Sequence, residues 1–232
     1  MGIFLDGIWQ AFYLLVTLDP EVLRITLLSL QISGSATLIS MLLGISSGAA
    51  VALAEFPGKR VVISLINTGM GLPPVVVGLF VTMFLWRNGP FGFLEILYTP
   101  VAMVIAQAVI AVPIVTGITI AAMQNLPPNL RLQILSLGAT RIQMVWILMK
   151  EARLPLLAAV MAGFGGVISE VGASIMVGGN IKGFTRVLTT ATVMETGKGN
   201  FELAIALGII LLLLAFLITG VLTIIQQREK RR

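Results

Sequence analysis

Five long apolar stretches dominate the pattern of hydrophobic and polar positions along the chain. A helix needs about 20 mostly apolar residues to cross the hydrocarbon core of a bilayer. Each of the five stretches is long enough, and they cover residues 22–54, 61–86, 101–123, 156–177 and 203–225. The pattern predicts an all-α integral membrane protein with five transmembrane helices, in which small residues such as Gly44 and Gly48 let helices approach closely.

The first twenty residues differ from these spans. Residues 1–18 are apolar but too short to cross, and polar side chains recur along them every three or four positions, at Asp6, Gln10, Tyr13 and Thr17. This spacing places one polar stripe on a helix, which is typical of a helix that lies in the membrane interface. We therefore predict an N-terminal interfacial helix in residues 1–20, ended by Asp19-Pro20 because proline cannot continue a helix. The alternative is six spans, with either 1–18 crossing or 22–54 divided in two.

Composition supports the membrane assignment. Of the 232 residues, 57% are hydrophobic and 11% are charged, whereas soluble domains carry about 25% charged residues. We assign residues 21–226 to one membrane domain and 227–232 to a solvated tail. The chain contains neither Cys nor His, so disulfides, zinc ligation by these residues and imidazole catalysis are excluded. A membrane enzyme is the least favoured class, and we expect no catalytic residue and no bound metal.

The basic residues predict the orientation of the chain. Ten of them fall on one side of the membrane and five on the other, and the side richer in Lys and Arg is cytoplasmic. The larger set is Lys59, Arg60, Arg131, Arg141, Lys150, Arg153, Arg228, Lys230, Arg231 and Arg232. The smaller set is Arg24, Arg87, Lys182, Arg186 and Lys198. This predicts an N-terminus outside and a C-terminus in the cytoplasm, and it explains the net charge of +5 without a nucleic-acid partner.

The polar-mixed segment 124–155 is predicted to form a helix–turn–helix. Pro128 suits a helix start, Gly138 a left-handed cap, and Thr140 the N-cap of a second helix. Its apolar residues need a buried partner surface, and they are Leu130, Ile134, Leu137, Ile142, Val145, Trp146 and Met149. That surface belongs either to another protein or to the chain's own helices and lipid.

Glu170 is the only acid or base well inside an apolar span. A charge in that position is costly unless it faces protein or water. We expect its carboxylate to accept hydrogen bonds from nearby backbone or from Ser169, Ser174 or Asn180. These bonds would stabilise a helix break at Gly172. The alternative is that the side chain reaches an exposed rim.

Pro73-Pro74 interrupt the second span. The backbone groups that a proline frees in a membrane helix must be satisfied by neighbours. Such a break is found where a helix lines a cavity or a subunit contact, and a simple kink is the alternative.

Several short motifs occur in order along the chain. They are Gly71-Leu-Pro-Pro-Val-Val-Val-Gly78, Asn88-Gly-Pro-Phe-Gly92, Glu170-Val-Gly-Ala-Ser174 with Gly179-Asn180-Ile181, and Thr185-Arg-Val-Leu-Thr189. Together they resemble the permease subunits of ATP-binding-cassette (ABC) importers of the molybdate, tungstate and sulfate group, and the tungstate type most of all. Gly138 followed by Leu154-Pro155 is similar to the coupling loop of that family. Leu132-Gln133-Ile134 stands where the family has Glu-Ala-Ala, and the spacing from Gly138 to Pro155 is longer by about one helical turn.

The resemblance implies a type I, MetI-like importer permease fold that works as a homodimer in the inner membrane, among membrane lipid. Two ABC ATPase subunits would dock on the coupling loop, and a substrate-binding protein would deliver a tetrahedral oxyanion, with tungstate preferred to molybdate or sulfate. The implied coupling residues are Leu132, Gln133, Ile134, Gly138, Ala139, Thr140 and Arg141. The implied pathway or gate residues are Pro73, Pro74, Glu170, Gly172, Ser174 and Asn180.

ATP and its magnesium are expected on the partner ATPase, and this chain is expected to bind no cofactor. No Gly-x-x-x-x-Gly-Lys-Ser/Thr phosphate loop occurs in it. On the outer loop, Lys182 and Arg186 would meet an arriving oxyanion, acidic residues of the delivery protein, or only solvent. A channel or a secondary carrier that works without ATP is the rival from another class, but it would need more ionisable residues inside the membrane than Glu170.

Overall fold

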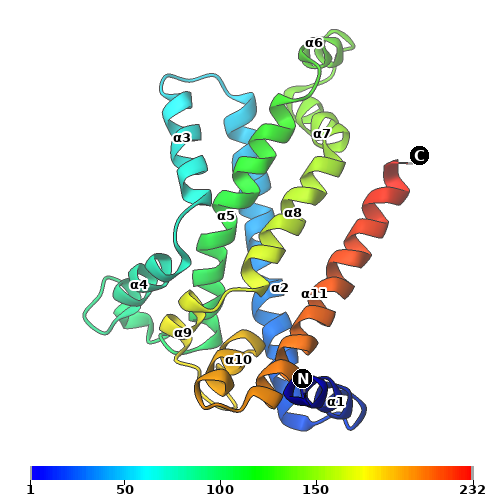
Figure 1. Ribbon diagram of the computed structural model, residues 1–232. Helices are drawn as coiled ribbons and strands as arrows, with labels where there is room; N and C mark the ends of the chain where they lie inside the picture. Colours follow the sequence, from blue (N-terminus) through cyan, green and yellow to red (C-terminus); the bar gives the residue numbers. More distant parts are fainter. Residues whose placement is uncertain (1, 231–232) are drawn as a thin grey trace.

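The computed structural model describes residues 2–230, and over these residues it consists of helices joined by short loops, with no strand. Figure 1 labels the α-helices in chain order. Their bounds are α1 Gly2–Val16, α2 Pro20–Leu53, α3 Lys59–Met70, α4 Pro74–Leu85, α5 Pro100–Gln124, α6 Pro128–Ser136, α7 Arg141–Glu151, α8 Arg153–Ile168, α9 Gly172–Gly178, α10 Leu188–Gly197 and α11 Phe201–Lys230, with a short 3-10 helix η1 at Gly92–Leu94.

Three of these helices, α2, α5 and α11, are long and apolar enough to cross a membrane alone. The other two apolar stretches are not single helices. Residues 61–86 form α3 and α4, which are bent by 101° at their junction. Residues 156–177 fall in α8 and α9, with a break between Ile168 and Gly172. Two of the five expected spans are therefore interrupted within the described residues.

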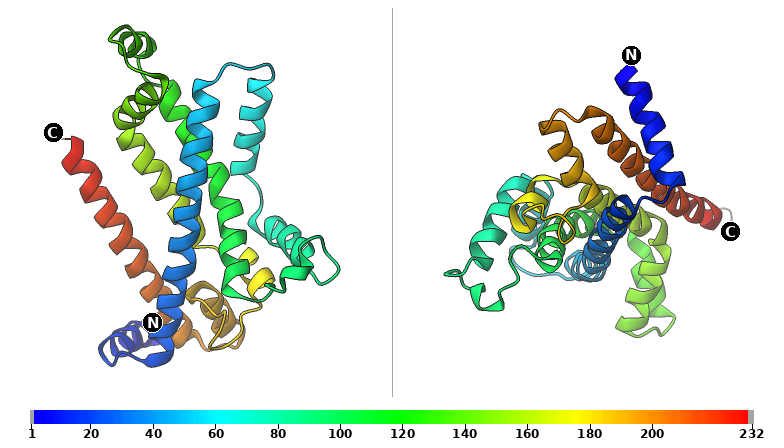
Figure 2. Two further views of the ribbon diagram at one scale, coloured as in Figure 1. Left: turned by 180° about the vertical axis from the view of Figure 1, so that it is seen from behind. Right: turned by 90° about the horizontal axis from the view of Figure 1, so that it is seen from below.

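Helix α5 lies at the centre of the bundle, between α2 and α8 (Figures 1 and 2). Glycines on α2 face it, as expected for helices that pack closely in lipid. A Cβ on Gly44 would lie 2.8 Å from Cβ of Val115, and one on Gly48 would lie 2.7 Å from Cβ of Thr119. Because the backbones approach this closely, alanine does not fit at either position without a shift. The predicted role of these two glycines is confirmed.

The bundle has two distinct ends. Helices α6 and α7 lie at one end, here called the α6 end, and α1, α9 and α10 gather at the other, the α10 end (Figures 1 and 2). The larger basic set is at the α6 end as far as it is described, since Lys59 begins α3 beside it and Arg131 and Lys150 belong to α6 and α7. Arg231 and Arg232 lie outside the described residues. The two sets are separated as the loop pattern predicts.

Helix α1 lies across the ends of α2 and α11 rather than along them (Figure 2). It packs on α11, where a Cβ on Gly7 would lie 2.6 Å from Cγ2 of Ile205. Large apolar side chains such as Trp9 and Phe12 remain exposed on it. This arrangement suits a helix in a membrane interface.

Asp19-Pro20 acts differently from the prediction. Helix α1 already ends at Val16, and Pro20 is the first residue of α2. The Asp19 side chain accepts hydrogen bonds from the backbone N–H groups of Glu21 and Val22, both at 3.0 Å. The pair therefore begins the next helix, because proline is well tolerated at a first helical position and Asp is a strong N-cap.

Candidate functional site

The two helix breaks lie side by side in the molecule. Helix α4, which follows the first break, packs against α9, which follows the second (Figure 1). A Cβ on Gly78 would lie 2.6 Å from Cα of Ala173, and one on Gly172 would lie 2.5 Å from Cγ2 of Val75. Reciprocal glycines therefore allow the two short helices to pack in close contact as one unit.

The first break is made by the prolines. Pro73 has extended backbone at φ −62° and ψ 122°, and Pro74 is the first residue of α4. Proline at this position loses no helical hydrogen bond, since the first N–H groups of a helix have no partner within it. The expected interruption is thus a complete helix end and a new start, rather than a kink in a continuous helix.

Glu170 forms the second break. Its side chain is buried, with 7% exposed, and Oε1 accepts a hydrogen bond of 2.8 Å from the backbone N–H of Ala173. The hydroxyl of Thr189, in α10, donates to the Glu170 carbonyl at 3.0 Å. Glu170 therefore caps the first turn of α9 and connects it to α10. The expectation that neighbouring backbone satisfies this carboxylate is confirmed.

The side chains expected beside Glu170 have other partners. Ser169 donates to the Gly165 carbonyl at 2.9 Å, and Ser174 accepts from Nε2 of Gln107 at 3.3 Å. Asn180 follows the left-handed Gly179 and has a positive φ of its own. Its Oδ1 is buried and has no hydrogen-bond partner among the described residues. Among the described residues, neither Ser174 nor Asn180 hydrogen-bonds to the carboxylate.

Lys182 and Arg186 are bound to the protein itself. Nζ of Lys182 lies 2.8 Å from Oε2 of Glu21, and Nη1 of Arg186 lies 3.7 Å from Oε1 of the same carboxylate. The Arg186 side chain is 14% exposed. The expected contacts of this pair were an oxyanion, a partner's acids or solvent, and Glu21 was not among them. Glu21 lies at the start of α2, far from both cations along the chain, so no local pattern indicated the pairing.

A second carboxylate lies beside this cluster. Glu195 in α10 accepts from Nζ of Lys198 at 2.8 Å and from Nδ2 of Asn200 at 3.1 Å. The hydrogen bond from Lys198 lowers the pKa of Glu195 below its ordinary value, against the opposing effect of burial. Glu195 and Lys198 line a cavity of about 470 Å³ together with Glu21, Lys182 and Arg186. These five charges are paired with one another, and Asp19, which also lines the cavity, accepts from backbone N–H groups. The arrangement favours a structural role.

The predicted helix–turn–helix at the α6 end is confirmed. Gly138 has φ +86°, and Thr140 caps α7 by accepting from the Gln143 N–H at 3.3 Å, while the Gln143 side chain accepts from the Thr140 N–H at 2.8 Å. This reciprocal pair is a capping box. The reciprocal bonds therefore fix where α7 begins, directly after the turn at Gly138.

The apolar residues of this segment divide into two groups. Ile134, Met144 and Leu148 are buried and pack with residues of α2, α5 and α8, and the half-buried Leu130, Val145 and Met149 pack against the same cluster. The second group faces outward, with exposed fractions of 67% at Leu132, 87% at Leu137, 83% at Ile142 and 69% at Trp146. The protein's own helices therefore bury only part of the apolar side chains of this segment. We call the four exposed side chains the apolar docking patch.

The polar coupling residues lie beside this patch. Gln133, Thr140 and Arg141 are exposed, and Ala139 is half-buried. Of the seven residues implied by the family resemblance, Ile134 alone is buried. The structure brings the seven together on one protruding unit at the α6 end, whereas the pathway residues belong to the α3–α4 junction and to α9 with its flanking segments, away from that unit (Figure 1).

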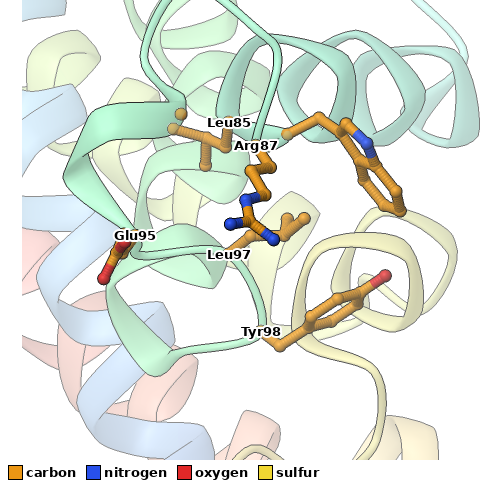
Figure 3. A pocket seen from close by; sticks show the side chains of 7 residues that line it. Leu85, Arg87, Glu95, Leu97 and Tyr98 are labelled. Carbon is orange, nitrogen blue, oxygen red and sulfur yellow. The ribbon is translucent and has the colours of Figure 1, made fainter.

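One pocket was not expected from the sequence. It opens between the end of α4 and the loop that leads to α5, and it has a volume of about 360 Å³. Figure 3 shows the guanidinium of Arg87 projecting into it beside Leu97 and Tyr98. The motif Asn88-Gly-Pro-Phe-Gly92 forms its loop, and the glycines and proline of this motif are typical of a tight turn.

The comparisons with known proteins agree with this architecture. The family described as "binding-protein-dependent transport system inner membrane component" matches residues 40–231. A probable anion ABC transporter permease protein of Haloferax volcanii is 44% identical over 82% of this chain and 84% of its own length. A tungstate uptake system permease protein of Peptoclostridium acidaminophilum is 39% identical over 96% of this chain and 97% of its own.

Solved structures confirm the predicted MetI-like fold. An inward-facing MetNI methionine ABC transporter covers 90% of this chain and 98% of its own, at a TM-score of 0.73 and 18% identity. An amino acid ABC transporter covers 94% and 98%, at a TM-score of 0.67 and 22% identity. The chain therefore belongs to the inner-membrane permease family of binding-protein-dependent ABC importers, as a multi-pass transport subunit and not an enzyme.

Proposed function

We propose that the chain is the homodimeric permease of a tungstate importer. The observation that carries the substrate is the 39% identity, over nearly the whole length of both chains, to a tungstate uptake permease. A second tungstate uptake permease, from Campylobacter jejuni, is 33% identical over 91% of this chain. Named molybdenum and sulfate permeases are more distant, at 29% and 27%.

Energy enters at the α6 end in this proposal. The apolar docking patch, with Gln133, Thr140 and Arg141 around it, inserts into a groove of an ABC ATPase that binds ATP and magnesium. The exposed side chains of Leu137, Ile142 and Trp146 support this role, because large apolar side chains left exposed beside polar ones mark protein contacts. The family's coupling Glu is absent, so the contact rests on apolar burial. The α6 end and the C-terminus are then cytoplasmic, and the N-terminus is outside.

Movement then passes along α8. Helix α7 joins α8 through a 70° bend, and Ala152 and Leu156 belong to the cluster that holds α7 on the bundle. The other end of α8 is the break at Glu170. A displacement of the docking patch is thereby transmitted to α9 and, through the Gly78–Ala173 contact, to α4.

The oxyanion pathway is proposed at the interface of two copies, lined by Pro73, Pro74, Glu170, Gly172, Ser174 and Asn180. One copy is too small a bundle to enclose a gated path. Exposed apolar side chains of α4, such as Val76 and Phe80, support burial against a second copy or lipid. The Glu170 carboxylate is engaged by backbone, so its role is to shape the pathway rather than to bind an anion.

The experiment is reconstitution in liposomes with the ATPase and binding protein of the same system. ATP-dependent uptake of labelled tungstate is measured against excess molybdate or sulfate. We expect uptake only when all three components are present, with tungstate preferred. Preference for molybdate or sulfate would correct the substrate alone. Flux through this chain without ATP would replace the proposal by a channel or carrier.

A further inference from the structure

The loop between α4 and α5 is built by close packing of its backbone. The N–H of Gly89 donates to the Trp86 carbonyl at 2.7 Å, and the N–H of Phe91 donates to the Phe84 carbonyl at 2.9 Å. A Cβ on Gly92 would collide with the carbonyl oxygens of Trp86 and Arg87. The loop therefore folds back onto the end of α4, and this close packing sets the backbone position of Arg87.

The opposite wall of the pocket carries unusual backbone. Glu95 has φ +51° and Tyr98 has φ +60°, a region that residues with side chains seldom adopt. Such conformations persist only where surrounding contacts impose them, and they cluster at binding sites. The Tyr98 N–H donates to the Val177 carbonyl of α9 at 2.9 Å, which is one such contact. The wall is thus fastened to the unit formed by α4 and α9.

Arg87 is the cation of this pocket, its side chain is exposed, and it takes part in none of the ion pairs found among the described side chains. Figure 3 shows the Glu95 carboxylate pointing away from the guanidinium. Trp86 and Tyr98 also line the space, and each carries one polar hydrogen that a ligand can accept. Because the guanidinium presents two parallel N–H donors, it matches the oxygens of a tetrahedral anion.

We propose that the Arg87 pocket binds a tetrahedral oxyanion group. Its volume of about 360 Å³ lies in the range of small-molecule sites, which leaves room for water or for the remainder of a larger molecule. Two sources supply this chemistry on the outer side of a membrane, a free oxyanion and the phosphate of an anionic phospholipid. Since Trp and Tyr are common at the level of lipid headgroups, both sources reach the pocket.

The site does not depend on the transport proposal. Binding here stabilises the ends of α4 and α5 against α9, through the Tyr98–Val177 bond, whatever the chain transports. If the Arg87 pocket binds no anion, the proposed ATP-driven uptake is still tested separately by the liposome experiment.

The test uses the fluorescence of Trp86 in the full chain. The chain has three tryptophans, so a Trp9→Phe, Trp146→Phe background makes Trp86 the single reporter. Sodium tungstate and inorganic phosphate are titrated at constant ionic strength in a maltoside detergent. In a second arm, the chain is placed in nanodiscs in which phosphatidylcholine is replaced stepwise by phosphatidylglycerol.

We expect a saturable change in Trp86 emission that Arg87→Gln weakens about tenfold or more, the effect of losing a charged hydrogen bond. Arg87→Lys, which keeps the charge without the planar fork, should weaken it less and guards against misfolding of the first variant. Arg24→Gln, an exposed cation at the same end, is the control and should change nothing. A response to tungstate or phosphate in detergent would identify a free oxyanion as the ligand of the pocket. A response only to phosphatidylglycerol would identify a lipid phosphate as the ligand. No response in either arm, or one that survives Arg87→Gln, overturns the proposal.

Discussion

The carboxylate of Glu170 accepts a hydrogen bond from the backbone N–H of Ala173 at 2.8 Å, inside an apolar span that has no other charged residue. The bond satisfies a first-turn N–H of α9 that has no partner within the helix. An acid buried among apolar helices thus serves to begin a helix, and the break at which it lies is where α8 gives way to α9. Removing the Glu170 carboxylate should therefore first destabilise the break between α8 and α9.

Glu170→Gln should therefore be tolerated better than Glu170→Leu. Glutamine keeps an oxygen that can accept from Ala173, whereas leucine leaves that N–H buried without a partner, at a cost of about 1–3 kcal/mol. Uptake by the reconstituted importer and thermal unfolding in detergent measure both effects. Glu55→Leu is the control, since the Glu55 side chain is 83% exposed and its ion pair with Lys59 lies at the surface. Equal loss of uptake in the glutamine and leucine variants would contradict the capping role.

Gly138→Pro should abolish capture of the ATPase while the chain still inserts into the membrane. Proline cannot adopt φ +86°, and it removes the Gly138 N–H that donates to the Leu135 carbonyl at 3.0 Å. Gly138→Asn is the matched variant, because asparagine tolerates the left-handed region and no atom lies within 4 Å of a Cβ there. Pull-down of the partner ATPase is the measurement. Normal capture by the proline variant would show that the turn between α6 and α7 is not needed for docking.

Gly78→Ala should destabilise the contact between α4 and α9. The added methyl group would lie 2.6 Å from Cα of Ala173, a backbone atom that moves only with its helix, and overpacking of this kind costs about 1–3 kcal/mol. Gly165→Ala is the control, since its Cβ would meet nothing within 4 Å. Thermal unfolding and transport are compared for the two variants. The proposed unit of α4 and α9 fails if both alanine variants behave alike.

Acid should weaken the α10 end through Glu195. Its pKa is lowered in the folded chain, chiefly by the hydrogen bond from Lys198. The stabilisation is therefore complete above the ordinary value of 4.5 and is lost as the pH falls through the lower folded pKa. The difference in unfolding temperature between the parent chain and Glu195→Gln should be constant near neutrality and shrink below about pH 4.5. A difference that grows on acidification would contradict this, and Glu55→Gln controls for general charge effects.

Local signals in the sequence predicted some of the structure residue by residue. The turn at Gly138 and the cap at Thr140 were predicted because helix caps depend on neighbours three or four positions away. Gly44 and Gly48 were identified as packing positions for the same reason, since their spacing places both on one helix face. Pairing of Glu170 with backbone followed from the cost of an unpaired charge among apolar residues.

Other features depend on residues that are distant in the sequence. The bend of 101° between α3 and α4 has a proline signal, but its angle is set by the packing of α4 on α9. The sequence indicated no ion-pair partner within the chain for Lys182 and Arg186, because Glu21 is distant from both and lies on α2. The pocket around Arg87 likewise needs Tyr98 to be held by α9.

The sequence alone determined that this is an apolar, multi-span helical protein with a structured polar segment, because burial in lipid and helix capping are read from composition and short-range spacing. The tertiary structure alone decided which breaks meet, which charges pair and which apolar side chains stay exposed. These outcomes depend on the relative placement of whole helices, and many weak contacts along the helices determine that placement together.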